Sequence, residues 1–123
     1  MLKISYLRWY LLTGLMGAMC WIFMAPTPMP FGIEIQRELG FVGHLLIFTI
    51  FSLACFSAFP RSLRQTAMVL LLMAICLEAV QILLPSRGAD IMDAIVNGIG
   101  ILVGYGIFRA LNAIKLCFDP YKG

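Results

Sequence analysis

Apolar residues dominate this chain in long runs that are separated by short polar or proline-containing segments. The runs cover approximately residues 9–25, 41–59, 65–84 and 91–111. Each is close to the ~20 mostly apolar residues that a helix needs to cross a bilayer. Pro26, Pro60 and Pro85 follow the first three runs, and proline ends a helix because it cannot continue the backbone hydrogen bonding. The pattern predicts an all-α fold, a polytopic bundle of four transmembrane helices.

The composition supports a membrane location. Of 123 residues, 62% are hydrophobic and 12% are charged, and the mean hydropathy is +0.96. A water-soluble fold of this size could not bury so much apolar surface. The length allows a single domain over 1–123. The net charge of +3 comes from basic residues that are scattered along the chain, so we expect no nucleic-acid partner.

The basic residues predict an orientation, because lysine and arginine favour cytoplasmic loops. Seven of them flank the chain ends and the second loop: Lys3, Arg8, Arg61, Arg64, Arg109, Lys115 and Lys122. The first and third loops contain only Arg37 and Arg87. Both termini should therefore be cytoplasmic, and the first and third loops should face outward.

Cysteine and histidine spacing argues against cofactor chemistry. The cysteines are far apart, without C-x-x-C or zinc-finger spacing, at positions Cys20, Cys55, Cys76 and Cys117. We expect no disulfide framework. The chain has one histidine, which excludes a multi-histidine metal site, so we predict neither a metal nor a cofactor.

The polar residues of the spans are expected to converge near the outer surface. Ionisable side chains within apolar spans are costly and are usually functional. The candidates are His44, Glu78, Gln81, Arg87, Asp90, Asp93 and Asn97. Glu78 precedes the outer end of the third run and Asn97 follows the outer start of the fourth, so both should lie roughly 10 Å below that surface. The sequence thus predicts an outward-facing polar pocket.

Helical spacing divides the fourth run into two parts. Its predicted stripe recurs at helical spacing and should share one face, with Asp90, Asp93 and Asn97 in the polar upper half and Gly100 and Gly104 in the lower half. The G-x-x-x-G unit of Gly100 and Gly104 is typical of closely packed membrane helices. The Gly14 and Ala18 pair is a weaker candidate for a second packing seam.

Three of the charged positions have alternative interpretations. Glu78 either hydrogen-bonds a neighbouring helix or acts as a proton carrier, ligand or general base. Arg87 either extends to the interface or neutralises carboxylates and holds an anionic headgroup. His44 is either an interface residue or a proton shuttle or ligand. The segment 34–38 is either a short interfacial helix or a solvated loop.

The remaining candidates also have structural alternatives. Asp90 can serve simply as the cap of the fourth helix. Asp93 lies one turn deeper and is less easily explained as a cap. For Gln81 and Asn97 we favour interhelical hydrogen bonding.

The polar pattern resembles the signature of the VanZ-like membrane protein family. From Glu78 to Gly100 it reads E-x-x-Q-x-x-x-P-x-R-x-x-D-x-x-D-x-x-x-N-x-x-G, and Gly43-His44 opens the second run as in that family. The resemblance covers roughly residues 38–108. It departs at Gly40 and Phe41, where the family often has an Asp-Lys pair. The resemblance implies a small bacterial inner-membrane protein, and the family's namesake is associated with resistance to the glycopeptide teicoplanin.

Three functions remain open at this point. The first, which we favour, is a binding or accessory protein for a cell-envelope amphiphile, such as a membrane lipid or a lipid-linked molecule. The second is an intramembrane enzyme in which Glu78 or Asp93 is a general base, although no H-E-x-x-H or G-x-S-x-G motif is present. The third is a component of a proton- or cation-coupled transporter, which would need a homo-oligomer or another membrane protein as partner.

Overall fold

The protein is a four-helix chain in its computed structural model, which describes residues 2–24, 33–83, 91–119 and 121. Side chains are described for 6–7, 9–19, 40–83, 91–119 and 121. The helices are α1 (Leu2–Met24), α2 (Ile33–Ala58), α3 (Leu63–Ile82) and α4 (Ile91–Phe118). The described residues form no strand, so the all-α prediction is confirmed.

Three of the helices have the length and composition to cross a membrane. Within the described side chains, these segments are Gly40–Ala58, Leu63–Ile82 and Ile91–Phe118, while Trp9–Met19 of α1 forms a shorter apolar stretch. The chain is therefore a multi-pass membrane protein. Large apolar side chains such as Val69, Leu72 and Leu102 are more than half exposed, as expected where the surrounding solvent is lipid.

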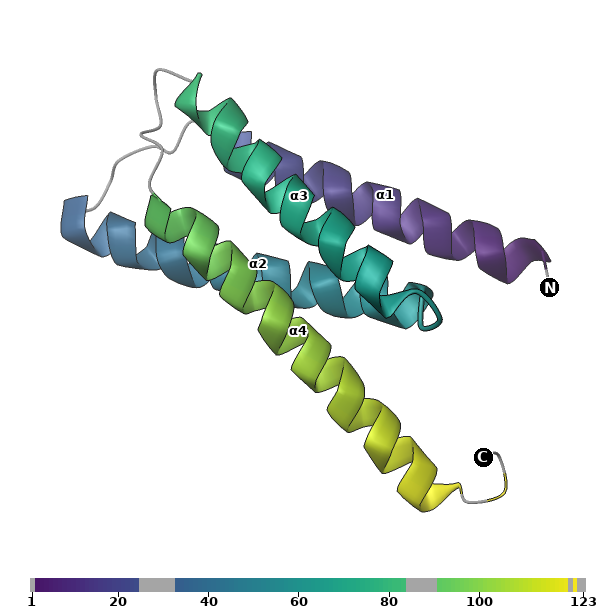
Figure 1. Ribbon diagram of the computed structural model, residues 1–123. Coiled ribbons are helices and arrows are strands. Elements are labelled where there is room, and N and C mark those ends of the chain that lie inside the picture. The colour runs from purple at the N-terminus through teal and green to yellow at the C-terminus, as the bar shows by residue number, and fades with distance from the viewer. Residues whose placement is uncertain (1, 25–32, 84–90, 120, 122–123) are drawn as a thin grey trace.

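Three helices extend well beyond the predicted runs. α1 begins at Leu2, seven residues before the start of the first run at Trp9. α2 begins at Ile33, so the segment 34–38 is helical and continuous with the second run. α4 continues to Phe118 instead of ending near 111. Residues 112–118 contain neither glycine nor proline, and the next proline in the sequence is Pro120. Nothing in the local sequence interrupts the helix before that point. Its C-terminal half extends past the other helices (Figure 1).

A tight turn reverses the chain between α2 and α3. Pro60 lacks a backbone N–H and cannot extend α2. The amide of Phe59 donates to Cys55 O over 3.0 Å, and that of Ser62 donates to Phe59 O over 3.1 Å. These bonds satisfy the backbone at the turn, and α3 starts at Leu63. α2 and α3 are consequently antiparallel (Figure 1).

The closest packing in the bundle joins α2 and α4 through Gly100 and Gly104. A Cβ added at Gly100 would lie 2.8 Å from Phe48 Cβ. One added at Gly104 would overlap Ser52 Oγ and lie 2.8 Å from Thr49 O. Only hydrogen fits between the backbones at these two positions. By contrast, a Cβ at Gly14 would have no neighbouring atom within 4 Å, so the structure does not place that residue in a second seam.

The core is formed by one buried stripe of side chains on each of the helices α2, α3 and α4. Buried positions recur at helical spacing. The apolar members are Phe48, Phe51, Cys55 and Phe56 of α2, Leu70, Ala74 and Leu77 of α3, and Ile101 and Phe108 of α4. α1 joins this core through Met19, which is 1% exposed. In the aromatic part, the rings of Phe56 and Tyr105 meet edge to face at 5.4 Å.

We expect Gly104→Ala to destabilise the protein by about 1–3 kcal/mol, since the added methyl group overpacks a backbone contact. Gly106→Ala is the matched control, because a Cβ there meets nothing within 4 Å. Removing a helical glycine at that position should be neutral or stabilising by up to about 1 kcal/mol. The measurement is the free energy of unfolding in mixed detergent micelles. Equal effects at the two positions would contradict the packing described for α2 and α4.

Candidate functional site

A chain of hydrogen bonds links α2, α4 and α3 through His44, Asn97 and Glu78. His44 Nδ1 lies 2.8 Å from Asn97 Oδ1. Asn97 Nδ2 donates to Glu78 Oε1 over 3.2 Å. The three residues are far apart in sequence, so their contact is a product of helix packing. The middle residue, Asn97, is the most buried of the three, at 1% exposed.

The direction of donation is consistent along this chain. The amide oxygen of Asn97 can only accept, so the His44 Nδ1 atom carries the hydrogen and donates. A neutral imidazole with hydrogen on Nδ1 has an acceptor at Nε2. The amide nitrogen of Asn97 donates to the carboxylate of Glu78. Asn97 thus orients both the ring of His44 and the carboxylate of Glu78.

Gln81 completes a cluster of buried polar side chains. It lies three residues after Glu78 on the same face of α3, and its side chain is 3% exposed. We call His44, Glu78, Gln81 and Asn97 the polar cluster. All four are among the candidates predicted from sequence, and all four are buried in a bundle whose outer surface is largely apolar.

The other candidates are placed differently. Asp93 is half-buried in the first turn of α4, where a carboxylate interacts favourably with the helix dipole. Arg87 and Asp90, which the sequence analysis assigned to the same site, lie outside the described residues. Gly100 and Gly104 follow Asn97 along α4 and contact α2.

Ser52 is a buried polar residue that the sequence analysis did not select. Its side chain is fully buried, and its Oγ donates to Thr49 O over 3.1 Å and lies 3.4 Å from Gly100 O. The signal was present in the sequence, because Ser52 follows His44 by two helical turns and so lies on the same face of α2. The Ser52 hydroxyl therefore links α2 to the backbone of α4 at Gly100. It does not contact the polar cluster through these bonds.

No group of three or more histidine, cysteine, aspartate or glutamate side chains within the described part of the chain could hold a metal ion. The polar cluster combines one carboxylate, one imidazole and two amides. Such a set is suited to hydrogen bonding with hydroxyl, amide or other polar groups of a ligand.

The family model described as VanZ/LLP1 matches residues 14–112, a range that contains every member of the polar cluster. Neither a curated protein nor a solved structure matches the chain.

We expect Asn97→Leu to lower the free energy of unfolding by about 1–3 kcal/mol, because it leaves the buried partners on α2 and α3 without their shared amide. Asn112→Leu makes the same change on the same helix, in the part of α4 beyond the cluster. That control should change stability by less than about 0.5 kcal/mol. Detergent-titrated unfolding measures both. A fully stable Asn97→Leu protein would show that the hydrogen-bond chain contributes nothing to the fold.

Proposed function

Because the chain belongs to the VanZ/LLP1 family, we propose that it binds the polar head of a cell-envelope amphiphile at the polar cluster. The observation that carries this proposal is the hydrogen-bonded chain from His44 through Asn97 to Glu78, drawn from three separate helices. Polar groups embedded among lipid-facing helices are costly. A purely structural role would need fewer buried polar groups. A neutral glutamine at position 78 would also cost less free energy to bury than the carboxylate of Glu78.

The site would recognise hydroxyl and amide groups in the ligand head. A glutamate carboxylate accepts hydrogen bonds from sugar hydroxyls, while Gln81 can both donate and accept. Asn97 is the most buried member of the polar cluster and serves to position its neighbours. In the proposed site, Arg87 and Asp90 contribute from the adjoining segment, where a guanidinium favours an anionic group. The apolar tail of the ligand would lie against the exposed helix faces.

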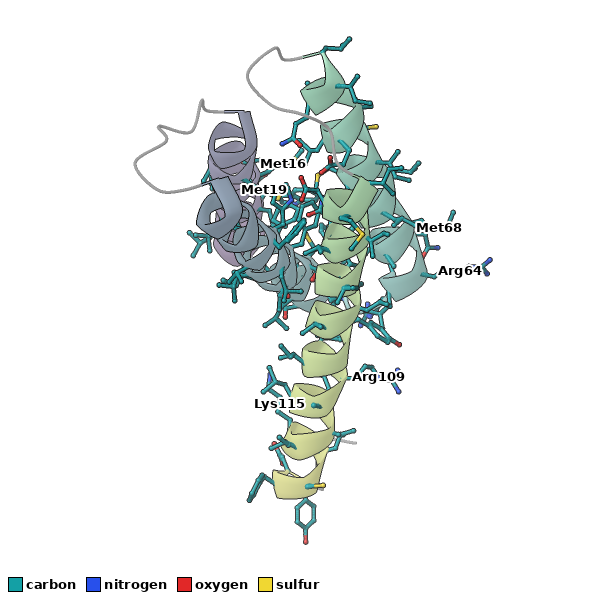
Figure 2. The ribbon with its side chains drawn as sticks, turned by 90° about the vertical axis from the view of Figure 1, so that its left-hand side faces the viewer. Met16, Met19, Arg64, Met68, Arg109 and Lys115 are labelled. Atoms are coloured by element: carbon teal, nitrogen blue, oxygen red, sulfur yellow. The ribbon has the colours of Figure 1, made fainter. Side chains whose placement is uncertain are left out.

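The proposed membrane orientation places the polar cluster toward the outer side. The N-terminus, the α2–α3 turn and the C-terminus lie toward the same end of the bundle (Figure 1). Arg64, Arg109 and Lys115 project from that half of the molecule (Figure 2). Basic residues favour the cytoplasm. Glu78 and Asn97, near the end of α3 and the start of α4, belong to the opposite half.

A protein that binds without catalysis fits the cluster better than a proton-coupled transporter. An uncharged amide stands between the imidazole and the carboxylate, and an asparagine does not readily pass a proton from one to the other. The intramembrane enzyme, with Glu78 as general base on a lipid-linked substrate, is the alternative. An enzyme would convert the bound substrate into a cleaved product, whereas a binding protein would retain its ligand unchanged.

The binding proposal is tested by native mass spectrometry of lipids that co-purify with the protein from a bacterial membrane. We expect a specific lipid-linked species on the wild type and at least a tenfold loss of it in Glu78→Gln. Cys76→Ala is the matched control, since Cys76 is exposed on the same helix and should leave the species in place. If all three proteins carry the same bulk phospholipid, the binding proposal is wrong. A cleaved species in the wild type alone would favour the enzyme.

The orientation proposal, in which α1 is a fourth span, is tested with reporter fusions. A reporter that is active only in the cytoplasm should work at the N-terminus, the C-terminus and the α2–α3 turn. A reporter that is active only outside should work between α1 and α2. If only three helices cross, the two termini will lie on opposite sides, and this orientation fails.

A further inference from the structure

The C-terminal part of α4 continues beyond the packed bundle. The last buried residue of α4 is Phe108, whose ring centroid lies 6.2 Å from that of Phe56 on α2. α2 itself ends at Ala58, whereas α4 runs on to Phe118. Residues 109–118 therefore extend past the helix against which α4 packs (Figure 1). We call residues 109–118 the α4 extension.

The length of α4 exceeds what is needed to cross a bilayer. α3 has 20 residues and α4 has 28. At a rise of 1.5 Å per residue, α3 is about 30 Å long and α4 is about 42 Å long. The hydrocarbon layer is about 30 Å thick. A helix longer than this layer tilts or continues into the interfacial region, and α4 crosses α2 obliquely (Figure 1).

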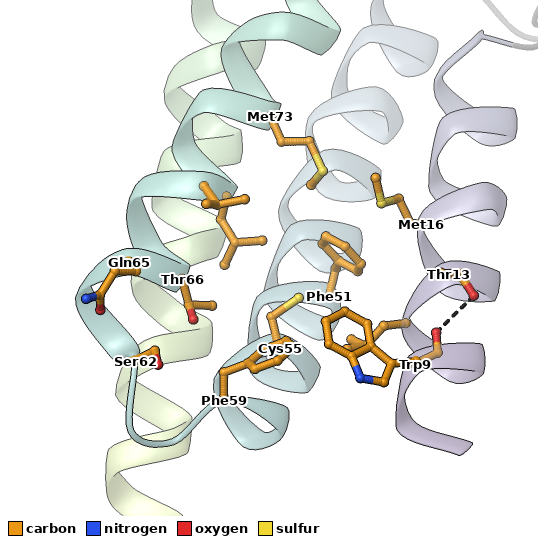
Figure 3. A pocket seen from close by; sticks show the side chains of 13 residues that line it. Trp9, Thr13, Met16, Phe51, Cys55, Phe59, Ser62, Gln65, Thr66 and Met73 are labelled. Atoms are coloured by element: carbon orange, nitrogen blue, oxygen red, sulfur yellow. Dashed lines mark hydrogen bonds between the residues drawn. The ribbon is translucent and has the colours of Figure 1, made fainter. Parts of the chain in front are cut away.

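The bundle changes from apolar to polar at the end where the α4 extension begins. A recess of about 380 Å³ between α1, α2 and α3 has an apolar surface. Met16 and Met73 lie at its inner end, whereas Ser62 and Gln65 lie next to the α2–α3 turn (Figure 3). The turn thus marks the edge of the apolar layer. The α4 extension passes the other helices at this same end of the bundle (Figure 1).

The face of α4 that is buried in the bundle becomes polar in the α4 extension. The positions that follow Phe108 on this face, four and seven residues later, are Asn112 and Lys115. Arg109 lies beside them, and Leu116 is an apolar exception on this side. The side chains of Arg109 and Lys115 are exposed and project from α4 (Figure 2). The change in polarity coincides with the end of α2, so this side of the extension is suited to water and headgroups.

An apolar stripe continues along another side of α4 without interruption. Its members recur every three or four residues and are all exposed: Val103, Ile107, Leu111, Ile114 and Phe118. We call them the outer stripe. The first two belong to the packed part of α4, where an exposed apolar surface faces lipid. The outer stripe therefore carries the lipid-facing surface of α4 into the α4 extension.

We propose that the α4 extension binds the membrane–water interface as an amphipathic segment, with the outer stripe against acyl chains and Arg109, Asn112 and Lys115 toward headgroups and water. Helices of this kind bind a bilayer through buried apolar area, with basic residues on the polar face. The bilayer is the partner that fits, because the outer stripe is continuous with a surface that already faces lipid. The long basic side chains can reach the headgroups from a helix at this depth.

This interaction is separate from ligand binding at the polar cluster, none of whose members lies within residues 109–118. It also does not depend on which side of the membrane the C-terminus occupies. By holding one end of α4 at the interface, the α4 extension would set the depth of Asn97 on the same helix.

The test compares two tryptophan positions on opposite sides of the α4 extension. Trp9→Phe with Trp21→Phe removes both native tryptophans of the full chain, and Asn112→Trp or Ile114→Trp then adds one. Positions two residues apart differ by about 3 Å along a helix and point in nearly opposite directions, so their comparison reports the side and not the depth. Each protein is reconstituted in phosphatidylcholine nanodiscs, and circular dichroism checks that it keeps the helical content of the wild type.

Two quenchers distinguish lipid from water. Phospholipid with brominated acyl chains quenches tryptophan in the acyl region, and acrylamide quenches it in water. We expect brominated lipid to quench Ile114→Trp at least threefold more strongly than Asn112→Trp, and acrylamide to quench it at least threefold less. Val103→Trp is the control for contact with acyl chains, because it lies on the outer stripe in the packed part of α4.

Three results would overturn the proposal. Strong quenching of both positions by acrylamide alone would place the α4 extension in water. Strong quenching of both by brominated lipid alone would place the whole extension inside the bilayer. Protection of Ile114→Trp from both quenchers would show that a protein surface, such as a second copy of this chain, covers the outer stripe.

Discussion

The polar cluster depends on the close approach of α2 and α4 at Gly100 and Gly104. Because only hydrogen fits at these positions, the two backbones come together and their register is set. Asn97 precedes Gly100 by one turn, and His44 precedes Phe48 by one turn. A seam formed by Phe48 and Gly100 therefore places the Asn97 amide beside the imidazole, at 2.8 Å. The glycines hold the site together without being part of it.

α3 contributes the carboxylate under a different constraint. Its buried stripe of Leu70, Ala74 and Leu77 packs into the shared core, and Glu78 and Gln81 continue this stripe toward the end of the helix. In lipid, where water cannot satisfy them, buried polar groups must find partners within the protein. Asn97 supplies such a partner for Glu78. Its hydrogen bonds thus link three helices whose outer faces are apolar.

The two ends of the bundle present different chemistry to the membrane. Toward one end, buried polar side chains meet between α2, α3 and α4. Toward the other, α1, α2 and α3 surround an apolar recess of about 380 Å³ that is lined by Trp9, Phe51 and Met73 among others. The polar cluster is suited to a ligand with many hydrogen-bonding groups, whereas the recess offers only apolar contacts.

The sequence by itself determined the all-helical class, the approximate positions of the apolar runs, the polar candidate residues and the family. A helix that crosses lipid must be long and mostly apolar, and this requirement is visible in a single chain. It did not predict the helical start of α2 at Ile33 or the continuation of α4 to Phe118, since apolar runs mark membrane thickness and not helix ends. Nor could it show that His44 reaches Asn97 or that Ser52 joins the seam. Only the tertiary structure decided those contacts and the apolar recess between α1, α2 and α3. They depend on how closely and in what register the helices pack, which periodicity along one helix does not specify.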